Sequence, residues 1–225
     1  MTLMSVSENL SLIQEKIDAV AAGAERASDD VQLVAVSKKQ PEGRIQEALG
    51  AGHRTFGENR VQEAQERWGA LRATYTDLKL HLIGPLQTNK AGDAVALFDV
   101  IETVDREKLA RILGKEMEKQ SRALPCFIQV NTGDEEQKAG ISLDALDGFY
   151  VFCTKECGLN IIGLMCIPPI NEEPERHFKL LAARAKALGL KHLSMGMSGD
   201  FERAISCGAT YVRVGTGVFG ARSKA

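Results

Sequence analysis

The sequence has 225 residues, of which 44% are hydrophobic and 26% are charged, the composition of a globular protein. The formal net charge of −2 excludes the strongly basic surface of a nucleic-acid-binding protein, and no apolar run is long enough to cross a bilayer. The N-terminus does not read as a signal peptide, and neither the five cysteines nor the four histidines show metal-ligand spacing. These features predict one domain, residues 1–225, that works in the reducing cytoplasm without a metal, nucleic acid or membrane.

The predicted elements begin with an amphipathic helix. Apolar residues recur there at three- and four-residue spacing, at Leu10, Ile13, Ile17 and Val20, so residues 1–28 are expected to form a helix that packs on the rest of the domain. Eight short apolar runs follow and are expected to be strands: Val31–Ser37, Arg54–Phe56, Leu78–Ile83, Phe98–Thr103, Pro125–Val130, Leu159–Cys166, His192–Leu193 and Thr210–Val214. Between them, helices are expected to begin near Pro41, Asn59, Thr88, Asp105, Ser142, Glu173 and Gly199.

This alternation predicts a single (β/α)8 TIM barrel, because regular βα repeats give right-handed crossovers and a parallel sheet. After the last predicted strand only GTGVFGARSKA remains, which is too short for a full covering helix. The N-terminal helix is therefore expected to fill that gap. An open doubly wound sheet is the alternative, because the second and seventh predicted strands are very short.

In such barrels the functional groups lie at the carboxyl ends of the strands. The first predicted strand ends in Ser37, Lys38 and Lys39, so at least one amine is expected at the mouth of the barrel. A lysine amine that burial makes neutral can form a Schiff base with a carbonyl compound. The structural alternative is a strand end that extends its lysines into water.

Two glycine-rich loops, after the seventh and eighth predicted strands, are suited to bind a phosphate. GTGVFG at residues 215–220 matches the dinucleotide pattern, but that reading requires a following helix, strand and acidic residue, and the sequence ends at Ala225. Ser198 and Gly199 are expected to open a helix whose amino end favours an anion. Tight turns that need glycine are the alternative. An amine beside a phosphate site suits either pyridoxal 5′-phosphate (PLP) or a sugar phosphate in a Schiff-base aldolase.

Arg213 lies between apolar residues in YVRVG, where a surface arginine is not expected. One interpretation is an internal ion pair with Glu58 or Asp200. The other is a partner for the nitrogen of a pyridoxal ring, where the positive charge would disfavour ring protonation and demanding carbanion chemistry.

Six ordered motifs between residues 33 and 222 resemble the YggS/PROSC family of PLP homeostasis proteins: AVSK, FGENRVQE, HLIGPLQTNK, QVNTGDEEQKAG, GLMCIPP and LSMGMSGDFERAISCGATYVRVGTGVFG. The resemblance implies a PLP fold type III barrel, like the N-terminal domain of alanine racemase, with the cofactor held as a Schiff base on Lys38. It also implies the remaining cofactor-binding residues. These are Ser198, Gly215 and Thr216 at the phosphate, Arg213 near the ring nitrogen, Asn59 close to the cofactor, and Met195 and Gly196 lining the pocket.

Two residues depart from the family pattern. Arg60 replaces the aromatic residue that commonly follows GEN, and Leu80 replaces the tryptophan that often precedes the histidine of the H-x-IG motif. Both are expected to flank the pocket, so they affect ring packing or the polarity of the entrance.

The resemblance implies a PLP-binding protein that contributes to vitamin B6 and amino-acid homeostasis without catalytic residues, with PLP-requiring apo-enzymes as further partners. An amino-acid racemase is the alternative, and it needs a second acid or base opposite the lysine. In the racemases a tyrosine from a second domain provides this group. Here Tyr75 and Tyr150 are expected in helices and Tyr211 in mid-strand, so none is a candidate.

Overall fold

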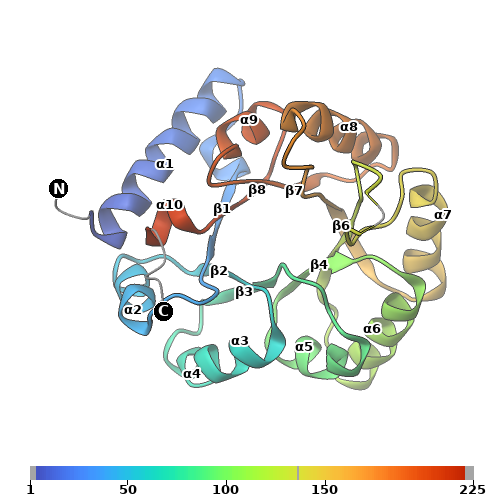
Figure 1. The fold of residues 1–225 in the computed structure, drawn as a ribbon. Helices are drawn as coiled ribbons and strands as arrows, with labels where there is room; N and C mark the ends of the chain where they lie inside the picture. Colours follow the sequence, from blue (N-terminus) through green and yellow to red (C-terminus); the bar gives the residue numbers. More distant parts are fainter. Residues whose placement is uncertain (1–3, 136, 221–225) are drawn as a thin grey trace.

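Eight parallel strands form a closed barrel in the computed structural model, which describes residues 4–135 and 137–220. Each strand pairs with its neighbours in sequence, and β8 closes the barrel on β1 (Figure 1). The strands are β1 (Gln32–Val36), β2 (Thr55–Glu58), β3 (Lys79–Leu82), β4 (Val100–Val104), β5 (Pro125–Gln129), β6 (Asn160–Met165), β7 (His192–Met197) and β8 (Tyr211–Val214). The predicted TIM barrel is confirmed, and the alternative of an open sheet is wrong.

Helices surround the barrel (Figure 1). They are α1 (Val6–Gly23), α2 (Glu42–Gly50), α3 (Val61–Trp68), α4 (Leu71–Thr74), α5 (Ala91–Leu97), α6 (Glu107–Lys119), α7 (Leu146–Val151), α8 (Pro174–Ala187), α9 (Phe201–Ser206) and α10 (Thr216–Phe219), with short 3-10 turns at Ser28–Asp30 and Thr88–Lys90 and a π-helical segment at Phe152–Glu156. In residues 4–135 and 137–220, no helix has the length and apolar character to cross a bilayer. In the same residues no group of three or more His, Cys, Asp or Glu side chains is arranged to hold a metal ion.

Alternation along the strands divides the core into two parts. Residues such as Leu33 and Ala35 pack outward in a continuous cluster with the helices. Inside the barrel, Val100, Phe127 and Met165 form a separate apolar cluster. Successive side chains along a barrel strand point alternately into the barrel and out toward the helices, so two separate apolar clusters are expected.

Helix α1 lies beside the short C-terminal helix α10, against the β8–β1 closure (Figure 1). A capping box begins α1: the Ser5 hydroxyl accepts from the Glu8 amide at 3.1 Å, and the Glu8 carboxylate accepts from the Ser5 amide at 2.8 Å. The Asn9 side chain also donates to the Val218 carbonyl at 2.9 Å. In this way α1 covers the part of the barrel where the last βα unit has only a four-residue helix.

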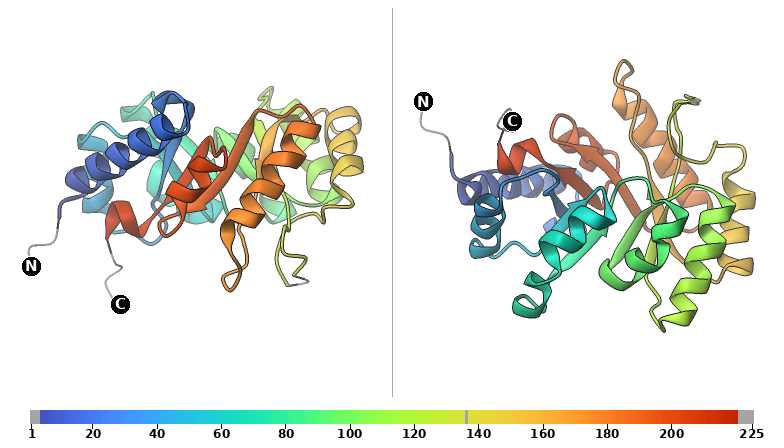
Figure 2. Two further views of the ribbon diagram at one scale, coloured as in Figure 1. Left: turned by 90° about the horizontal axis from the view of Figure 1, so that it is seen from above. Right: turned by 60° about the horizontal axis from the view of Figure 1, so that its bottom comes forward.

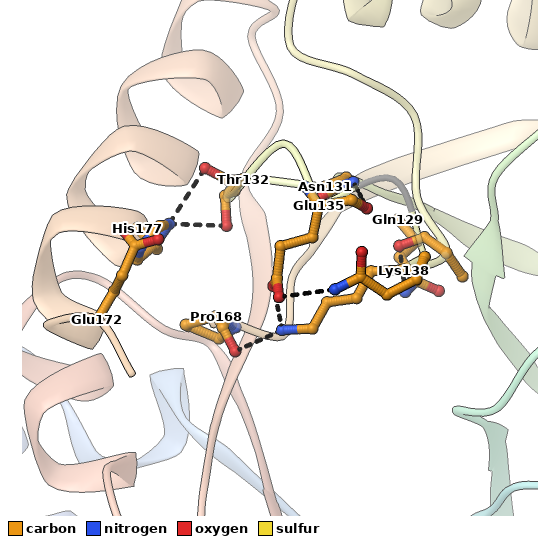
Figure 3. A network of polar contacts seen from close by, with 10 residues as sticks. Gln129, Asn131, Thr132, Glu135, Lys138, Pro168, Glu172 and His177 are labelled. Atoms are coloured by element: carbon orange, nitrogen blue, oxygen red, sulfur yellow. Dashed lines mark hydrogen bonds and ion pairs between the residues drawn. The ribbon is translucent and has the colours of Figure 1, made fainter. Parts of the chain in front are cut away.

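Two long loops, after β5 and after β6, extend beyond the barrel at the carboxyl ends of the strands (Figure 2). Polar contacts join them, as Figure 3 shows. The Lys138 ammonium donates to the Pro168 carbonyl at 3.3 Å, and the buried His177 ring of α8 lies 3.1 Å from the Thr132 hydroxyl and 3.2 Å from Glu172. The loops therefore form one connected wall on the β5–β6 side of the mouth.

Candidate functional site

Four of the predicted site residues follow four consecutive strands of the barrel. Ser198 comes directly after β7, Gly215 after β8 and Asn59 after β2, while Lys38 comes two residues after β1. The strand order β7–β8–β1–β2 places them side by side along one arc of the carboxyl-terminal rim. Barrel closure thus brings together loops that are far apart in the sequence.

Lys38 lies in a turn rather than in the strand. β1 ends at Val36, and a hydrogen bond of 3.1 Å from the Gln40 amide to the Ser37 carbonyl closes the turn. Lys38 is half-buried, whereas Lys39 is exposed and has a φ of 56°. The two neighbouring amines therefore differ: Lys38 is partly enclosed at the mouth, and Lys39 is in solvent.

A buried cluster outside the barrel supports this turn. The Glu58 carboxylate is fully buried, and its Oε1 accepts from the Ser37 hydroxyl at 2.7 Å, the Arg67 guanidinium at 2.7 Å and the Trp68 indole at 3.0 Å. Arg67 and Trp68 are the last two residues of α3. We call Ser37, Glu58, Arg67 and Trp68 the outer cluster.

Ser198 lies against the loop that follows β8. Its hydroxyl oxygen accepts from the Gly215 amide at 3.2 Å and from the Gly217 amide at 3.3 Å. Because both lone pairs of the oxygen are used in this way, the hydroxyl proton is available to donate to a further acceptor. Thr216, between the two glycines, is exposed. The arrangement leaves the Ser198 hydroxyl proton as a donor for an anion at the rim.

Arg213 points into the barrel and is 4% exposed. In the sheet it lies opposite Val34 of β1 and Met197 of β7. Its guanidinium donates to the Ser194 hydroxyl at 2.5 Å and to the Cys166 carbonyl at 2.8 Å. The side chain therefore spans from β8 past β7 to the end of β6, just below the mouth.

The ion-pair partner of Arg213 is Glu102, at 3.9 Å, and not Glu58 or Asp200 as the sequence suggested. The fully buried Glu102 accepts from the Ser194 hydroxyl at 2.6 Å and lies 2.6 Å from the His81 ring. The expectation was wrong because Glu58 faces outward, to α3, while Glu102 faces the interior. We call His81, Glu102, Ser194 and Arg213 the inner cluster.

The inner cluster keeps the Glu102 carboxyl ionised. Burial raises the pKa of Glu102, but the His81 ring, the Arg213 charge and the Ser194 hydroxyl together lower it by more, so the pKa lies below the ordinary value. The negative charge of Glu102 therefore balances the positive charge of Arg213 inside the barrel.

The other predicted residues occupy different surroundings. Asn59 is half-buried, and its Oδ1 is buried with no hydrogen-bond partner in the described part of the chain. Gly84 approaches its backbone so closely that a Cβ there would lie 2.3 Å from the Asn59 carbonyl oxygen. Asn59 is thus fixed at the rim with an unused acceptor.

Met195 does not join the group at the mouth, because it is fully buried in the outer core with Phe201 of α9. Gly196 has a φ of 90°, and a Cβ there would lie 2.9 Å from Phe201 Cα, so this position requires glycine for the close approach of β7 and α9. Leu80 is also in the outer core, and exposed Arg60 pairs with Glu63 at 3.2 Å. Of the two departures from the family pattern, only Arg60 lies at the rim.

Sequence reasoning overlooked both buried clusters. The sequence predicts His81 and Glu102 as ordinary strand residues, Ser194 as part of the loop after the seventh strand, and Arg67 and Trp68 as helix residues. A signal was present for Glu102, because a carboxylate inside the apolar run FDVIETV needs an internal partner. Nothing comparable identified Arg67, whose partners are mainly backbone carbonyls.

Comparison with known proteins identifies the family. The model of the alanine racemase N-terminal domain matches residues 9–223. Pyridoxal phosphate homeostasis protein from Escherichia coli K12 is 39% identical over 226 residues, which cover 96% of this chain and 97% of that protein. The protein of the same name from Aquifex aeolicus is 37% identical over 228 residues, or 97% and 99% of the two chains. This chain belongs to the pyridoxal phosphate homeostasis protein family.

Solved structures agree with this family assignment. PipY of Synechococcus elongatus with PLP bound has a TM-score of 0.79 and 37% identity, over 91% of this chain and 100% of PipY. PipY without PLP has a TM-score of 0.85 and 35% identity, over 96% and 100%. D-threonine aldolase from Filomicrobium marinum, at 16% identity and a TM-score of 0.65, shares the fold alone. The resemblance read from the motifs is confirmed.

Proposed function

We propose that this protein binds PLP at the β7–β8–β1–β2 rim, with the Lys38 amine as the covalent attachment point, and that it stores and releases the cofactor as part of vitamin B6 and amino-acid homeostasis. The observation that carries the proposal is the barrel closure. It places the Lys38 turn directly beside β8, which supplies both Arg213 and the Gly215 loop. Membership of the PLP homeostasis family supports the same function.

The residues present fit this cofactor. PLP supplies an aldehyde, which condenses with a neutral primary amine: the nitrogen forms a double bond to the aldehyde carbon, and the two amine hydrogens leave with the aldehyde oxygen as water. Lys38 would provide the amine. The hydroxyl proton of Ser198 would donate to the phosphate beside the Gly215–Thr216 loop, whose Gly215 amide donates to the Ser198 oxygen. The unused Oδ1 of Asn59 would accept from a polar group of the ligand.

Arg213 would face the pyridine nitrogen with a permanent positive charge. Since Glu102 balances that charge and Ser194 fixes its direction, the guanidinium is held in place before the ligand arrives. A cation at that position disfavours protonation of the ring nitrogen, which makes the ring a weak electron sink. Binding without turnover is the function that such an environment favours.

The positions of the tyrosines also favour binding over racemisation. Tyr75 follows the last residue of α4, Tyr150 lies in α7, and Tyr211 is the first residue of β8, at the amino end of the barrel rather than in mid-strand as expected. Burial and the Glu102 charge raise the pKa of Tyr211 above its ordinary value. Among residues 4–135 and 137–220, which contain all three tyrosines, none lies at the rim opposite Lys38 as a second acid or base.

We further propose a cytoplasmic location, with PLP-requiring apo-enzymes as recipients of the cofactor. All five cysteines are free thiols, the state that a reducing compartment maintains. Burial raises the pKa of Cys153 and of Cys166 to about 12, so these two thiols resist oxidation. Transfer would be measured as the recovery of activity by an apo-enzyme mixed with the PLP-loaded protein.

The attachment point is tested by reducing the PLP-loaded protein with borohydride and mapping the modified peptide by mass spectrometry. We expect the adduct on Lys38. Lys38→Ala should lose both the adduct and the visible absorption band while keeping its thermal midpoint, and Lys39→Ala should keep both.

An adduct on Lys39 would move the attachment point, and a protein that stays colourless in excess PLP would refute the proposed function. To test turnover, the loaded protein is incubated with amino acids in D2O. Incorporation of deuterium at the α-carbon would favour a racemase. A colourless protein that borohydride links to a sugar phosphate would favour an aldolase.

A further inference from the structure

The guanidinium of Arg67 contacts both ends of the turn that carries Lys38. Its Nη1 donates to the Ser37 carbonyl at 2.9 Å, and its Nη2 donates to the Gln40 carbonyl at 3.2 Å. The second hydrogen of Nη1 is directed to the Glu58 carboxylate at 2.7 Å. One planar, rigid group thus fixes the separation of the two carbonyls that flank Lys38 and Lys39.

This turn needs external support because Lys39 adopts a left-handed backbone conformation, with a φ of 56°. Residues with a Cβ populate that region sparingly, and lysine has no side-chain group suited to stabilise it locally. Such conformations persist when surrounding contacts determine them. Here the hydrogen bond of the turn, from the Gln40 amide to the Ser37 carbonyl, is reinforced by the two bonds from Arg67.

Glu58 and Trp68 hold the side chain of Arg67 in position. The fully buried carboxylate bonds to Arg67 and to the Ser37 hydroxyl through the same oxygen, and Trp68 donates to that oxygen from the next position of α3. The Trp68 ring packs on Phe56 with a centroid distance of 4.6 Å. The base of the turn is therefore bound to both β2 and α3.

We infer that Arg67 is a positioning residue for Lys38: it holds the Ser37–Gln40 turn so that the Lys38 amine, rather than the adjacent Lys39 amine, is directed into the mouth. This inference rests on the proposed attachment of PLP at Lys38. Arg67 does not touch the ligand in this scheme, and it acts only through the two carbonyls.

Arg72 provides a matched control at the opposite end of the barrel. Its side chain is 29% exposed, against 20% for Arg67, and it pairs at 2.5 Å with Asp99, which directly precedes β4. Both arginines connect a helix to the sheet through a carboxylate. Only Arg67 contacts the turn of Lys38.

The test mixes PLP with full-length protein freed of cofactor and follows the visible band by stopped flow across a range of pH. The variants are Arg67→Met, Arg67→Lys and Arg72→Met, with thermal midpoints measured in parallel. For Arg67→Met we expect a rate slower by on the order of tenfold, since small misplacements of a reacting group have effects of this size or larger. Borohydride mapping should show part of the adduct moved to Lys39.

Arg67→Lys should recover only part of the rate, because an ammonium cannot span two carbonyls and a carboxylate in one plane. Arg72→Met should react at the wild-type rate even if its thermal midpoint falls as far as that of Arg67→Met. If Arg67→Met does not fold, Glu58→Gln takes its place, since it removes the charge that orients Arg67 and keeps the shape of the side chain.

Equal rates and an unchanged adduct position in Arg67→Met, or in Glu58→Gln where that variant replaces it, would overturn the inference while leaving the proposed function intact. An equal slowing in Arg72→Met would also overturn it, because the effect would then follow from stability alone. A wild-type protein that forms no adduct at Lys38 would instead refute the proposed function itself.

Discussion

The outer and inner clusters each contain a fully buried carboxylate, yet the two carboxylates are used differently. Glu58 lies between the sheet and α3, and one of its oxygens takes three donors while the other has no hydrogen-bond partner in the described residues. Glu102 lies inside the barrel, where one oxygen contacts His81 and the other contacts Ser194 and Arg213.

The arginine of each cluster shows what the difference means. Arg67, partly exposed, donates two hydrogens to the backbone of the Lys38 turn, so the outer cluster orders the main chain. Arg213, almost fully buried, directs its charge along the barrel interior, so the inner cluster sets the electrostatic field below the mouth. Similar chemistry gives conformational control at one site and charge control at the other.

The largest effect is expected from Glu102→Gln. This change leaves the buried Arg213 charge without its counter-charge, and breaking a buried pair in this way costs about 3 kcal/mol of unfolding free energy. Glu58→Gln should cost less, because Arg67 keeps access to water and to two carbonyls. Urea unfolding followed by circular dichroism measures both variants. A greater loss in Glu58→Gln would show that the outer cluster carries more of the stability.

The pH dependence of unfolding should show a smaller effect that also distinguishes the Glu102 carboxylate. The pKa of Glu102 is lower in the folded protein than its ordinary value, which is about 4.3 in model peptides. Its contribution is therefore present above that value and is lost as the pH falls through the lower folded pKa. The stability difference between wild type and Glu102→Gln should be constant near pH 7 and narrow below about pH 4. A difference that widens on acidification would contradict the assigned direction.

The smallest effects are expected from one serine in each cluster. Ser37→Ala and Ser194→Ala each remove a hydroxyl bond to a buried carboxylate, of 2.7 and 2.6 Å respectively, and each should cost about 2 kcal/mol. Their effects on PLP should differ. Ser37→Ala should slow formation of the visible band without moving it, and Ser194→Ala should move the band without slowing its formation. A band shift in Ser37→Ala together with slower band formation in Ser194→Ala would contradict the roles assigned to the outer and inner clusters.

The barrel and much of the rim could be predicted from local sequence. Each strand is a short apolar run, and each helix follows a turn signal. The alternation of strands and helices that defines the fold can therefore be predicted from residues that are close together in the sequence. The predicted seventh strand, His192–Leu193, is too short, because Ser194 and Gly196 interrupt the apolar pattern. Yet β7 extends to Met197, since Ser194 is satisfied by the inner cluster and Gly196 allows α9 to approach.

The motifs placed Lys38, Asn59, Ser198 and the Gly215 loop at strand ends, and strand order then put them in one arc. The partner of Arg213 could not be obtained in this way. Glu58 and Glu102 both follow apolar residues in short strands, and only the face on which each lies separates them. That face depends on the register of the closed sheet, so an arginine of β8 meets a carboxylate of β4 across the barrel.

The sequence by itself determined the alternating elements, the family and the lysine at the end of the first strand, because these depend on residues close together in the chain. The tertiary structure alone decided which buried charges face each other and which helix residue holds the Lys38 turn. Those pairings join residues on different strands and helices, and only closure of the barrel and packing of α3 bring them within hydrogen-bond distance.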